Sequence, residues 1–259
     1  MKRIGLWMAL GVLVLCASCG TIGSQWTYLT EEAKVYTVKK VDPANPPCFD
    51  CRWWSPVWEK AETQGIKFFT ANSKVKDVIV QFRLLHDEKY IYGIAYTNDR
   101  YVSAVYTYPN EMPCRDNCFE AFLMPSDKGY VNMEISIAGG ILGEFHPRPK
   151  GGKDNEYWPG ERMSAEFVGK TFQAKTSLPG PVNPECESTL VWVIEFRFPV
   201  SIYKRFMENP EAALSGQVWR GNFFHCAGHS SHPRWAAWSP LGAFGGFHDP
   251  SHFATVKFE

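Results

Sequence analysis

The sequence predicts an all-β protein, specifically an antiparallel β-sandwich with long loops and little helix. Short runs rich in β-branched and aromatic residues recur along the chain, and clusters of turn-forming residues separate them. No long stretch keeps the 3.6-residue period of an amphipathic helix. Aromatic residues make up 15% of the chain, with 18 prolines and 21 glycines, a composition typical of a turn-rich domain with a large aromatic core.

Several runs predict strands, and two pairs of them predict hairpins. The runs are 77–85, 90–98, 118–124, 130–138, 191–198, 219–226 and 252–258. A short polar link joins the first two runs, and a turn-forming segment joins the next two, so we expect each pair to form an antiparallel hairpin. Residues 200–207 are expected to form a short helical turn, and residues 147–160 a long irregular loop that contains Trp158.

The run 130–138 alternates between apolar and polar residues. Its apolar positions all point to one side of the strand: Val131, Met133, Ile135 and Ile137. Asn132, Glu134 and Ser136 point to the other side. We therefore expect this second face to be hydrated or to form a site.

The N-terminus predicts export. Two basic residues precede an apolar run, residues 4–15, that is too short to span a bilayer as an ordinary transmembrane helix. Ala17 and Ser18 lie directly before Cys19, which resembles the lipobox of bacterial lipoproteins and implies acylation of Cys19 after cleavage. An ordinary secretory signal cut near the same place is the alternative, and Cys19 would then be a spare thiol.

These features divide the chain into three expected segments. Residues 1–18 form a lipoprotein signal peptide, residues 19–47 a tether and edge segment, and residues 48–259 the β-sandwich domain. No apolar run after the signal is long enough to cross a membrane. Any membrane attachment would therefore come from the lipid alone, in the outer membrane, at the cell surface or facing the periplasm.

The charge balance argues against a nucleic-acid partner. The chain has 27 basic and 27 acidic residues, and cleavage of the signal removes Lys2 and Arg3, which lowers the basic count from 27 to 25. Binding to phosphates requires a clustered excess of lysine and arginine, which a nearly neutral domain lacks.

Six cysteines follow Cys19, and an even number in an oxidising compartment favours structural disulfides. The candidates are Cys48, Cys51, Cys114, Cys118, Cys186 and Cys226. The sequence does not determine their pairing. The two close pairs also look like half-sites for zinc, and free thiols are the third alternative.

Several segments together resemble the family 9 carbohydrate-binding modules, over roughly residues 48–259. The motifs are Asp50 with Trp58 and Ala61, then 90–95, 116–123, 220–224, 235–240 and 247–250. The resemblance implies an antiparallel β-sandwich that holds sugar ends or short glycans and is found beside glycoside hydrolases. It also implies that two tryptophans clamp a sugar, and that structural calcium is a possible cofactor.

Tryptophans in loops are the first candidates for a sugar site. The C–H face of a pyranose packs on an indole ring, so a binding ring must stand outside the core. Trp235 and Trp238 lie in a turn-rich segment, and Trp158 lies in the long loop. The alternative for each of them is a place in the core.

Four polar residues could complete the site. Arg220 and Asn222 alternate along one strand and could bind sugar hydroxyls or carboxylates. Glu120 and Glu134 lie on the two strands of one predicted hairpin and could approach each other. The alternatives are an ion pair between Arg220 and one of the glutamates, a calcium site, or a catalytic pair in a glycosidase, which needs two carboxylates.

The last part of the chain is rich in histidine. The histidines there are His225, His229, His232, His248 and His252, with Asp249 among them. Imidazoles of this kind can bind zinc or copper. Their spacing is irregular, however, so we expect them to be polar surface groups.

These observations predict an exported lipoprotein that binds carbohydrate without catalysis, in polysaccharide capture or catabolism. Its expected partners are a glycan or oligosaccharide and co-secreted glycoside hydrolases. The first alternative is a glycoside hydrolase or accessory domain that acts on O-glycosyl compounds. The second is an envelope scaffold that binds another protein.

Overall fold

The computed structural model describes residues 34–242 and 246–259, which belong to one compact unit, Ala33–Glu259. The expected signal peptide, residues 1–18, and the expected acylation site Cys19 lie outside the described residues. Within the described ranges, no helix combines the length and the apolar character needed to cross a bilayer.

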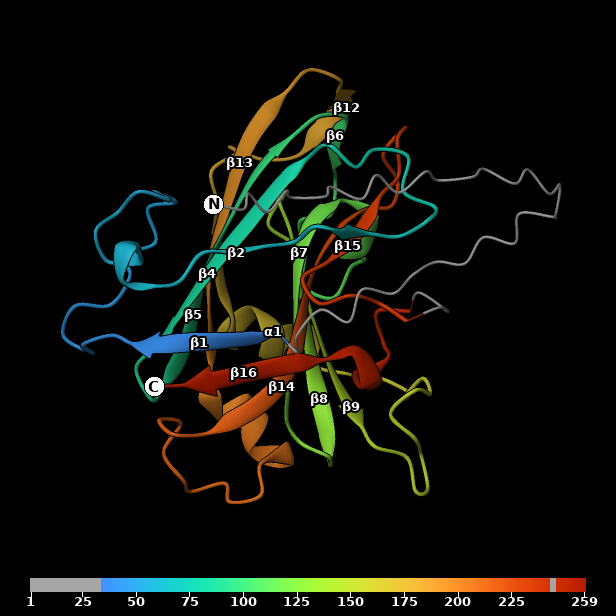
Figure 1. The fold of residues 1–259 in the computed structure, drawn as a ribbon. Coiled ribbons are helices and arrows are strands. Elements are labelled where there is room, and N and C mark those ends of the chain that lie inside the picture. The colour runs from blue at the N-terminus through green and yellow to red at the C-terminus, as the bar shows by residue number, and fades with distance from the viewer. Residues whose placement is uncertain (1–33, 243–245) are drawn as a thin grey trace, which may run out of the picture. The chain divides into compact units, whose positions relative to one another are not determined.

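The described residues form sixteen strands and five short helices (Figure 1). The strands are β1 (Val35–Lys40), β2 (Gln64–Gly65), β3 (Phe68–Phe69), β4 (Ile79–His86), β5 (Tyr90–Asp99), β6 (Val102–Ala104), β7 (Asn117–Ser126), β8 (Gly129–Ser136), β9 (Ile141–Pro147), β10 (Glu161–Arg162), β11 (Gln173–Thr176), β12 (Val182–Cys186), β13 (Leu190–Pro199), β14 (Val218–Ala227), β15 (Trp235–Ala237) and β16 (Ala254–Phe258). The helices are α1 (Ala165–Thr171) and four 3₁₀ turns, η1 (Trp58–Lys60), η2 (Pro113–Arg115), η3 (Val200–Phe206) and η4 (Pro250–His252).

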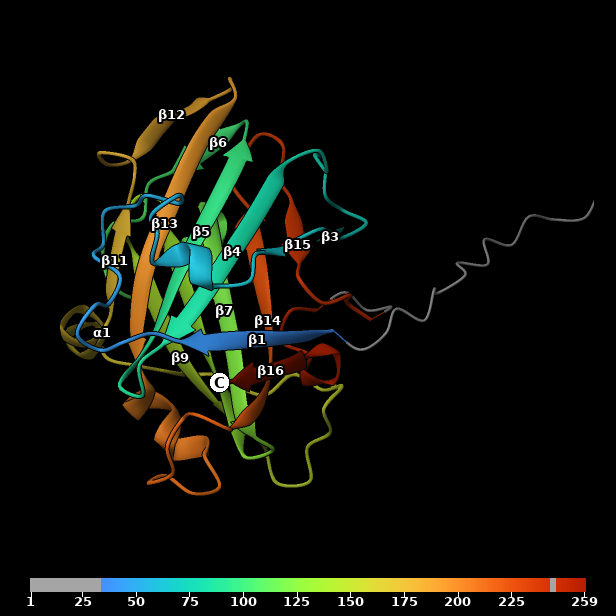
Figure 2. The ribbon, with the colours of Figure 1, turned by 60° about the vertical axis from the view of Figure 1, so that its left-hand side comes forward.

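The long strands form two layers, which confirms the predicted β-sandwich. The first layer contains β10, β9, β8, β7, β14 and β16, and the second contains β4, β5, β13 and β11. Figure 2 shows β4, β5 and β13 in front of β7 and β14, with β1 and β16 lying side by side and running roughly crosswise to the long strands. Adjacent long strands pair antiparallel, whereas β1 pairs parallel with both β16 and β4 and so joins the layers.

Each predicted run falls on a strand. The predicted hairpins are the antiparallel pairs β4–β5 and β7–β8, and the predicted helical turn is η3. In the expected tether and edge segment, β1 begins at Val35. The buried Tyr36 hydroxyl on β1 accepts a hydrogen bond of 2.6 Å from the Leu84 N–H on β4 and donates one to the Glu62 carbonyl. This strand is therefore fixed to both layers rather than lying at a free edge.

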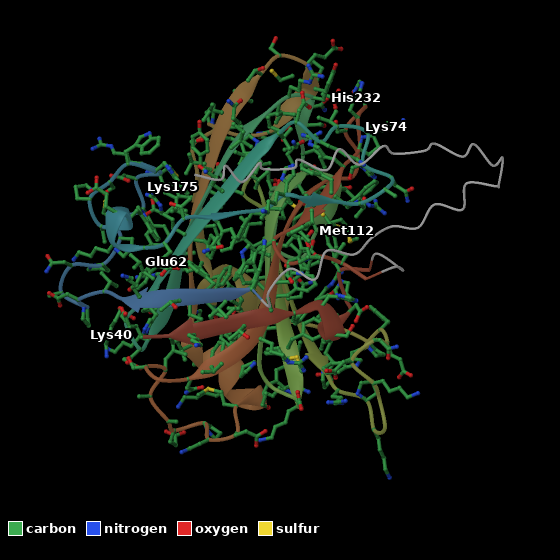
Figure 3. The ribbon with its side chains drawn as sticks, viewed as in Figure 1. Lys40, Glu62, Lys74, Met112, Lys175 and His232 are labelled. Carbon is green, nitrogen blue, oxygen red and sulfur yellow. The ribbon has the colours of Figure 1, made fainter. Side chains whose placement is uncertain are left out.

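The main core lies between the inner faces of the two layers, where side chains fill the space (Figure 3). All four apolar positions of the run 130–138 point into it, as the alternation predicts. Phe82 on β4 lies at its centre, with its ring centroid 4.3 Å from that of Phe223 on β14. Gly93 on β5 is opposite Phe196 on β13, and a Cβ atom there would lie 2.0 Å from the Phe196 ring, so only glycine fits.

The outer face of the first layer is not hydrated at the polar positions of the run 130–138, so the first of the two expectations for this face is wrong. Asn132, Glu134 and Ser136 are buried, because loops cover this side of β7, β8 and β14. A second apolar cluster lies under those loops and includes Phe122, Tyr130, Trp158, Phe224 and Phe253. The alternation thus identified the two faces correctly, but the second face is a buried polar layer.

Replacing Phe82 by alanine should destabilise the fold by about 3–5 kcal/mol, because the substitution leaves a cavity between the two layers. Thermal or urea unfolding followed by circular dichroism would measure the change. Val218→Ala, at an exposed position of β14, should change the stability by less than about 0.5 kcal/mol. Equal effects of the two substitutions would contradict a shared core at Phe82.

Candidate functional site

The predicted tryptophans do not all face solvent. Trp158 and Trp238 are fully buried, and the indole N–H groups donate to the Lys153 carbonyl and to the Gln64 side chain, each at 2.9 Å. Both rings therefore fill space in the core, which favours a structural role over sugar binding for these two residues. Trp235 is partly exposed on β15, opposite Cys226 of β14.

Arg220 holds loops together at the surface. Its guanidinium lies 2.8 Å from Asp127 and 3.0 Å from Asp154, and it donates to the Pro250 carbonyl. The alternative of an ion pair between Arg220 and Glu120 or Glu134 is wrong, because Arg220 forms its ion pairs with these two aspartates instead.

Asn222 is buried, and both polar atoms of its side chain form hydrogen bonds within the protein. Its side-chain oxygen accepts from the Ser239 N–H at 2.9 Å, and its amide donates to the Ser239 carbonyl at 3.2 Å. These bonds fasten β14 to the segment that follows β15. The side chain has no free face for a ligand.

Glu120 and Glu134 lie directly opposite each other on β7 and β8, as expected. Both are buried, and burial raises the pKa of each carboxyl, with the neighbouring Glu134 adding to the effect on Glu120. The thiols of Cys118 and Cys226 approach Glu120 Oε1, and the Asn132 amide donates to Glu134. A sugar ring has no access between these carboxylates, so the geometry does not favour glycoside hydrolysis here.

The cysteines between residues 34 and 259 are all free thiols in the structure, so the disulfide prediction finds no support. Cys118 and Cys226 are opposite each other on β7 and β14. Among the described residues, one group of metal-binding side chains lies close enough together to hold an ion. It consists of these two cysteines and Glu120. Calcium prefers six to eight oxygen ligands, so this group does not fit the calcium that the family resemblance implied.

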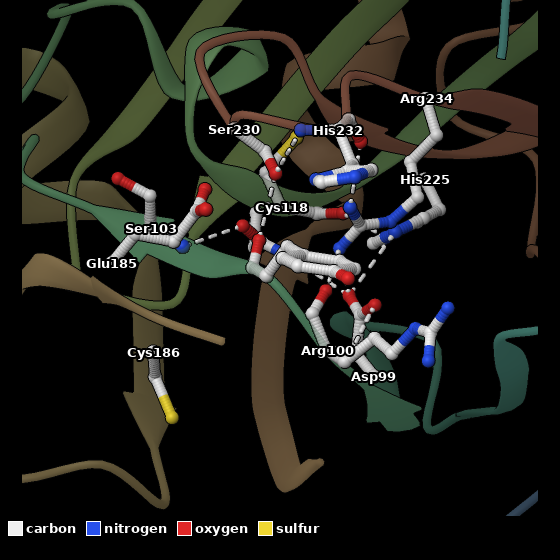
Figure 4. Close-up of polar contacts among 12 residues, drawn as sticks. Asp99, Arg100, Ser103, Cys118, Glu185, Cys186, His225, Ser230, His232 and Arg234 are labelled. Atoms are coloured by element: carbon white, nitrogen blue, oxygen red, sulfur yellow. Dashed lines mark hydrogen bonds and ion pairs between the residues drawn. The ribbon is translucent and has the colours of Figure 1, made fainter. Parts of the chain in front are cut away.

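The histidines are dispersed over the domain. His225 is buried between Asp99 and Cys118, and His232 stacks on Tyr101 with ring centroids 3.7 Å apart. Figure 4 shows these side chains around the buried ion pair in which Arg234 donates to Asp99 at 2.5 Å. This network closes one end of the sandwich, and within the described chain the histidines do not converge on a metal site.

Sequence reasoning missed the most exposed tryptophan in the described part of the chain, Trp54. Its side chain is 75% exposed, whereas that of the adjacent Trp53 is 3% exposed. The two rings meet edge to face with centroids 6.4 Å apart. On its other side, Trp53 packs against Tyr96 at 5.6 Å and under the Arg83 guanidinium at 4.3 Å. These contacts therefore hold the Trp53 ring in place, and it supports the outward-pointing indole of Trp54.

A groove of about 430 Å³ lies beside Trp54, on the outer face of the second layer. It is lined by Cys51, Arg52, Trp53, Trp54, Ser55, Pro56, Tyr96, Val191 and Val193. This volume falls within the range of about 300–1,000 Å³ that is common for small-ligand sites. Aromatic and apolar walls with a few polar groups are also typical of such sites.

A buried carboxylate positions the loop that carries Trp54. Glu195 on β13 accepts hydrogen bonds from the Cys51 N–H at 2.7 Å and from the Trp58 indole N–H at 3.2 Å. Burial raises the pKa of Glu195, and these two donors partly offset that effect. Phe49 and Cys51 have φ angles of 55° and 58°, so the chain turns sharply before the two tryptophans.

Polar side chains stand at the rim of the groove. The Arg52 side chain is 80% exposed and lies 3.6 Å from the Asp50 carboxylate, and Ser55 adds a hydroxyl. A flat ring with nearby donors and acceptors can hold a pyranose, whose C–H face packs on the ring while its hydroxyls form hydrogen bonds.

A signal for this site was present in the sequence. Trp53 and Trp54 are consecutive and lie between Cys51 and the turn dipeptide Ser55-Pro56. Two adjacent large side chains in a turn rarely fit the same core, so one of them tends to be left outside. The pattern did not indicate which one, because that depends on Tyr96 and Arg83 beneath the loop.

Comparison with known proteins identifies the family. Residues 57–258 match carbohydrate-binding family 9. The chain belongs to this family. No curated protein sequence matches the chain. The matched residues include both layers of the sandwich, while the Trp54 loop lies just before them.

Solved structures support the same fold. A candidate carbohydrate-binding protein from Bacteroides uniformis is 26% identical, with a TM-score of 0.72, and the match covers 88% of this chain and 100% of that one. A family 9 module from Caldicellulosiruptor kristjanssonii, solved with glucose, is 14% identical with a TM-score of 0.56, covering 87% and 96% of the two chains. A family 9 module from the same organism, solved with cellotriose, gives a TM-score of 0.52, with 14% identity and coverage of 87% and 94%.

His248 should make the stability of this domain depend on pH. Its ring lies 4.8 Å from that of His146, and its Nδ1 is 2.8 Å from the Tyr130 hydroxyl. Burial, reinforced by His146 and opposed by Glu144, lowers the pKa of His248 to about 4. The unfolded chain takes up this proton near pH 6.5 and the folded chain does not, so stability is lost as the pH falls from about 6.5 to 4.

Replacing His248 by glutamine should remove up to about 3 kcal/mol of this pH dependence. The check is urea unfolding of both proteins at several pH values between 4 and 7. Val218→Ala, at an exposed position without a titratable group, should leave the pH profile unchanged and serves as the control. If wild type and H248Q lose stability in parallel, the buried neutral imidazole is not the cause.

Proposed function

We propose that this chain binds carbohydrate without catalysis, at the groove beside Trp54. The observation that carries the proposal is one outward indole held on a buried, tightly packed tryptophan. Membership of carbohydrate-binding family 9 supports the ligand class. Family 9 modules of the same fold have been solved with glucose and with cellotriose, which makes these two sugars the first probes.

The groove favours modest affinity. One exposed indole offers a single stacking face, and the rim side chains must lose conformational freedom to bind hydroxyls. Trp53, by contrast, is already fixed by Tyr96 and Arg83, so the ring beneath the site needs no ordering. We expect dissociation constants of about 10 µM to 1 mM, which correspond to roughly 4–7 kcal/mol.

The proposal includes the cellular context. The basic N-terminus, the short apolar run and Cys19 support export and a lipid anchor in the bacterial envelope. An anchored sugar-binding domain would hold glycans near the cell during polysaccharide capture or catabolism. Co-secreted glycoside hydrolases would then be its natural partners.

Replacing Trp54 by alanine should weaken sugar binding at least tenfold, a loss of about 1.4 kcal/mol, because the stacking surface is removed. Isothermal titration calorimetry with glucose and cellotriose would measure this, followed by a glycan array if neither binds. Because the ring is exposed, the substitution should leave the melting temperature nearly unchanged.

Tyr108→Ala provides the matched control for this experiment. Tyr108 is 70% exposed and lies outside the groove, so its removal should leave sugar affinity unchanged. Unchanged affinity in the W54A protein would place the sugar elsewhere. Failure of the wild-type protein to bind any glycan on the array, together with capture of an envelope protein, would favour the scaffold alternative.

Replacing Cys19 by alanine should abolish lipid attachment and release the protein from the membrane fraction. Metabolic labelling with a radioactive fatty acid, followed by fractionation, would test this in a bacterial host. Cys16→Ala should still be labelled and serves as the control. Labelling of the C19A protein would refute the anchor, and no labelling of the wild type would support an ordinary secretory signal.

A further inference from the structure

Three metal-binding side chains meet on the outer face of the first layer, where β7 and β14 pair. Cys118 and Glu120 belong to β7, and Cys226 lies opposite Cys118 on β14. One ligand atom of each residue lies within 4.8 Å of those of the other two. All three residues are at most 2% exposed.

The distances between these ligand atoms suit an ion with tetrahedral coordination. Glu120 Oε1 lies 3.0 Å from the Cys226 sulfur and 3.6 Å from the Cys118 sulfur. In a tetrahedral site with Zn–S of about 2.3 Å and Zn–O of about 2.0 Å, sulfur and oxygen ligands are about 3.5 Å apart. The three side chains therefore already outline one face of such a tetrahedron.

Further donors lie beside this face. Met112, labelled in Figure 3, precedes the turn η2, which carries Cys114. The Cys114 N–H donates to Glu134 Oε2 at 3.2 Å, and its thiol contacts the same carboxylate. Glu134 in turn lies opposite Glu120. A fourth ligand can thus come from Cys114 or from Glu134.

The carboxyl groups of Glu120 and Glu134 have no basic side chain as a partner in the described part of the chain. Within the described part of the chain, neither Glu120 nor Glu134 forms an ion pair with a lysine, arginine or histidine. Burial disfavours the ionised form of each carboxyl, and two ionised carboxylates side by side would also repel each other. A bound divalent cation would compensate both effects. The sulfur ligands select a soft or borderline ion such as zinc over calcium or magnesium.

We propose that Cys118, Glu120 and Cys226, completed by Cys114 or Glu134, form a zinc site that ties β7 to β14. Each thiol that binds loses its S–H bond, forms a Zn–S bond and releases one proton to solvent, without any oxidation or reduction. A site closed by protein ligands leaves no position for a substrate, which is typical of structural zinc.

The full chain, purified under reducing conditions without chelators, should contain one zinc ion per molecule by atomic emission. After removal of the metal, Co²⁺ alone should give a sulfur-to-cobalt charge-transfer band in the near ultraviolet, which reports thiolate ligands directly. Cys226→Ser should weaken zinc binding by on the order of 100-fold. Cys186→Ser, on β12 and outside the cluster, should bind zinc like the wild type.

Two results would overturn the proposal. One is absence of zinc together with two missing thiols by thiol titration, as a disulfide between Cys118 and Cys226 would produce. The other is zinc below a tenth of an ion per chain with all thiols free and no cobalt band. The groove lies on the outer face of the other layer, so W54A should keep its zinc, and loss of sugar binding and loss of zinc are separate outcomes.

Discussion

The packing of the two inner sheet faces around Phe82 is the interaction on which the rest of this structure depends. Because side chains alternate along a strand, placing Val131 and Ile135 in that core sends Glu134 to the opposite face. Register then brings Glu134 beside Glu120. The inner core thus determines what each outer face carries, even though it contains neither the residues that line the Trp54 groove nor the cluster of Cys118, Glu120 and Cys226.

Loops cover the outer faces of the two layers to different extents. Loops cover the first, so its polar side chains are buried with two thiols and become a place where a cation would be stabilised. The second outer face is covered only in part, by the loop that Glu195 holds. Trp53 occupies the space above Tyr96, which leaves Trp54 no room in the fold and exposes its ring. One face therefore suits a buried ion and the other a flat ligand.

Much of the fold could be predicted from local patterns. Alternation and turn residues identified the strands and both hairpins, and the hairpin spacing brought Glu120 and Glu134 together. The candidate sugar site could not be predicted in the same way. The exposure of a tryptophan depends on which neighbours fill the space around it, and Trp158 and Trp238 found such space in the cores whereas Trp54 did not.

The sequence by itself determined the all-β class, the near-neutral charge and the two faces of each long strand, because these follow from composition and from contacts between near neighbours. Only the tertiary structure decided that the second face of β8 is buried, that Cys118 meets Cys226, and that Trp54 stands outside. Each of those outcomes joins residues far apart in the chain, and long-range packing has no signature in a local pattern.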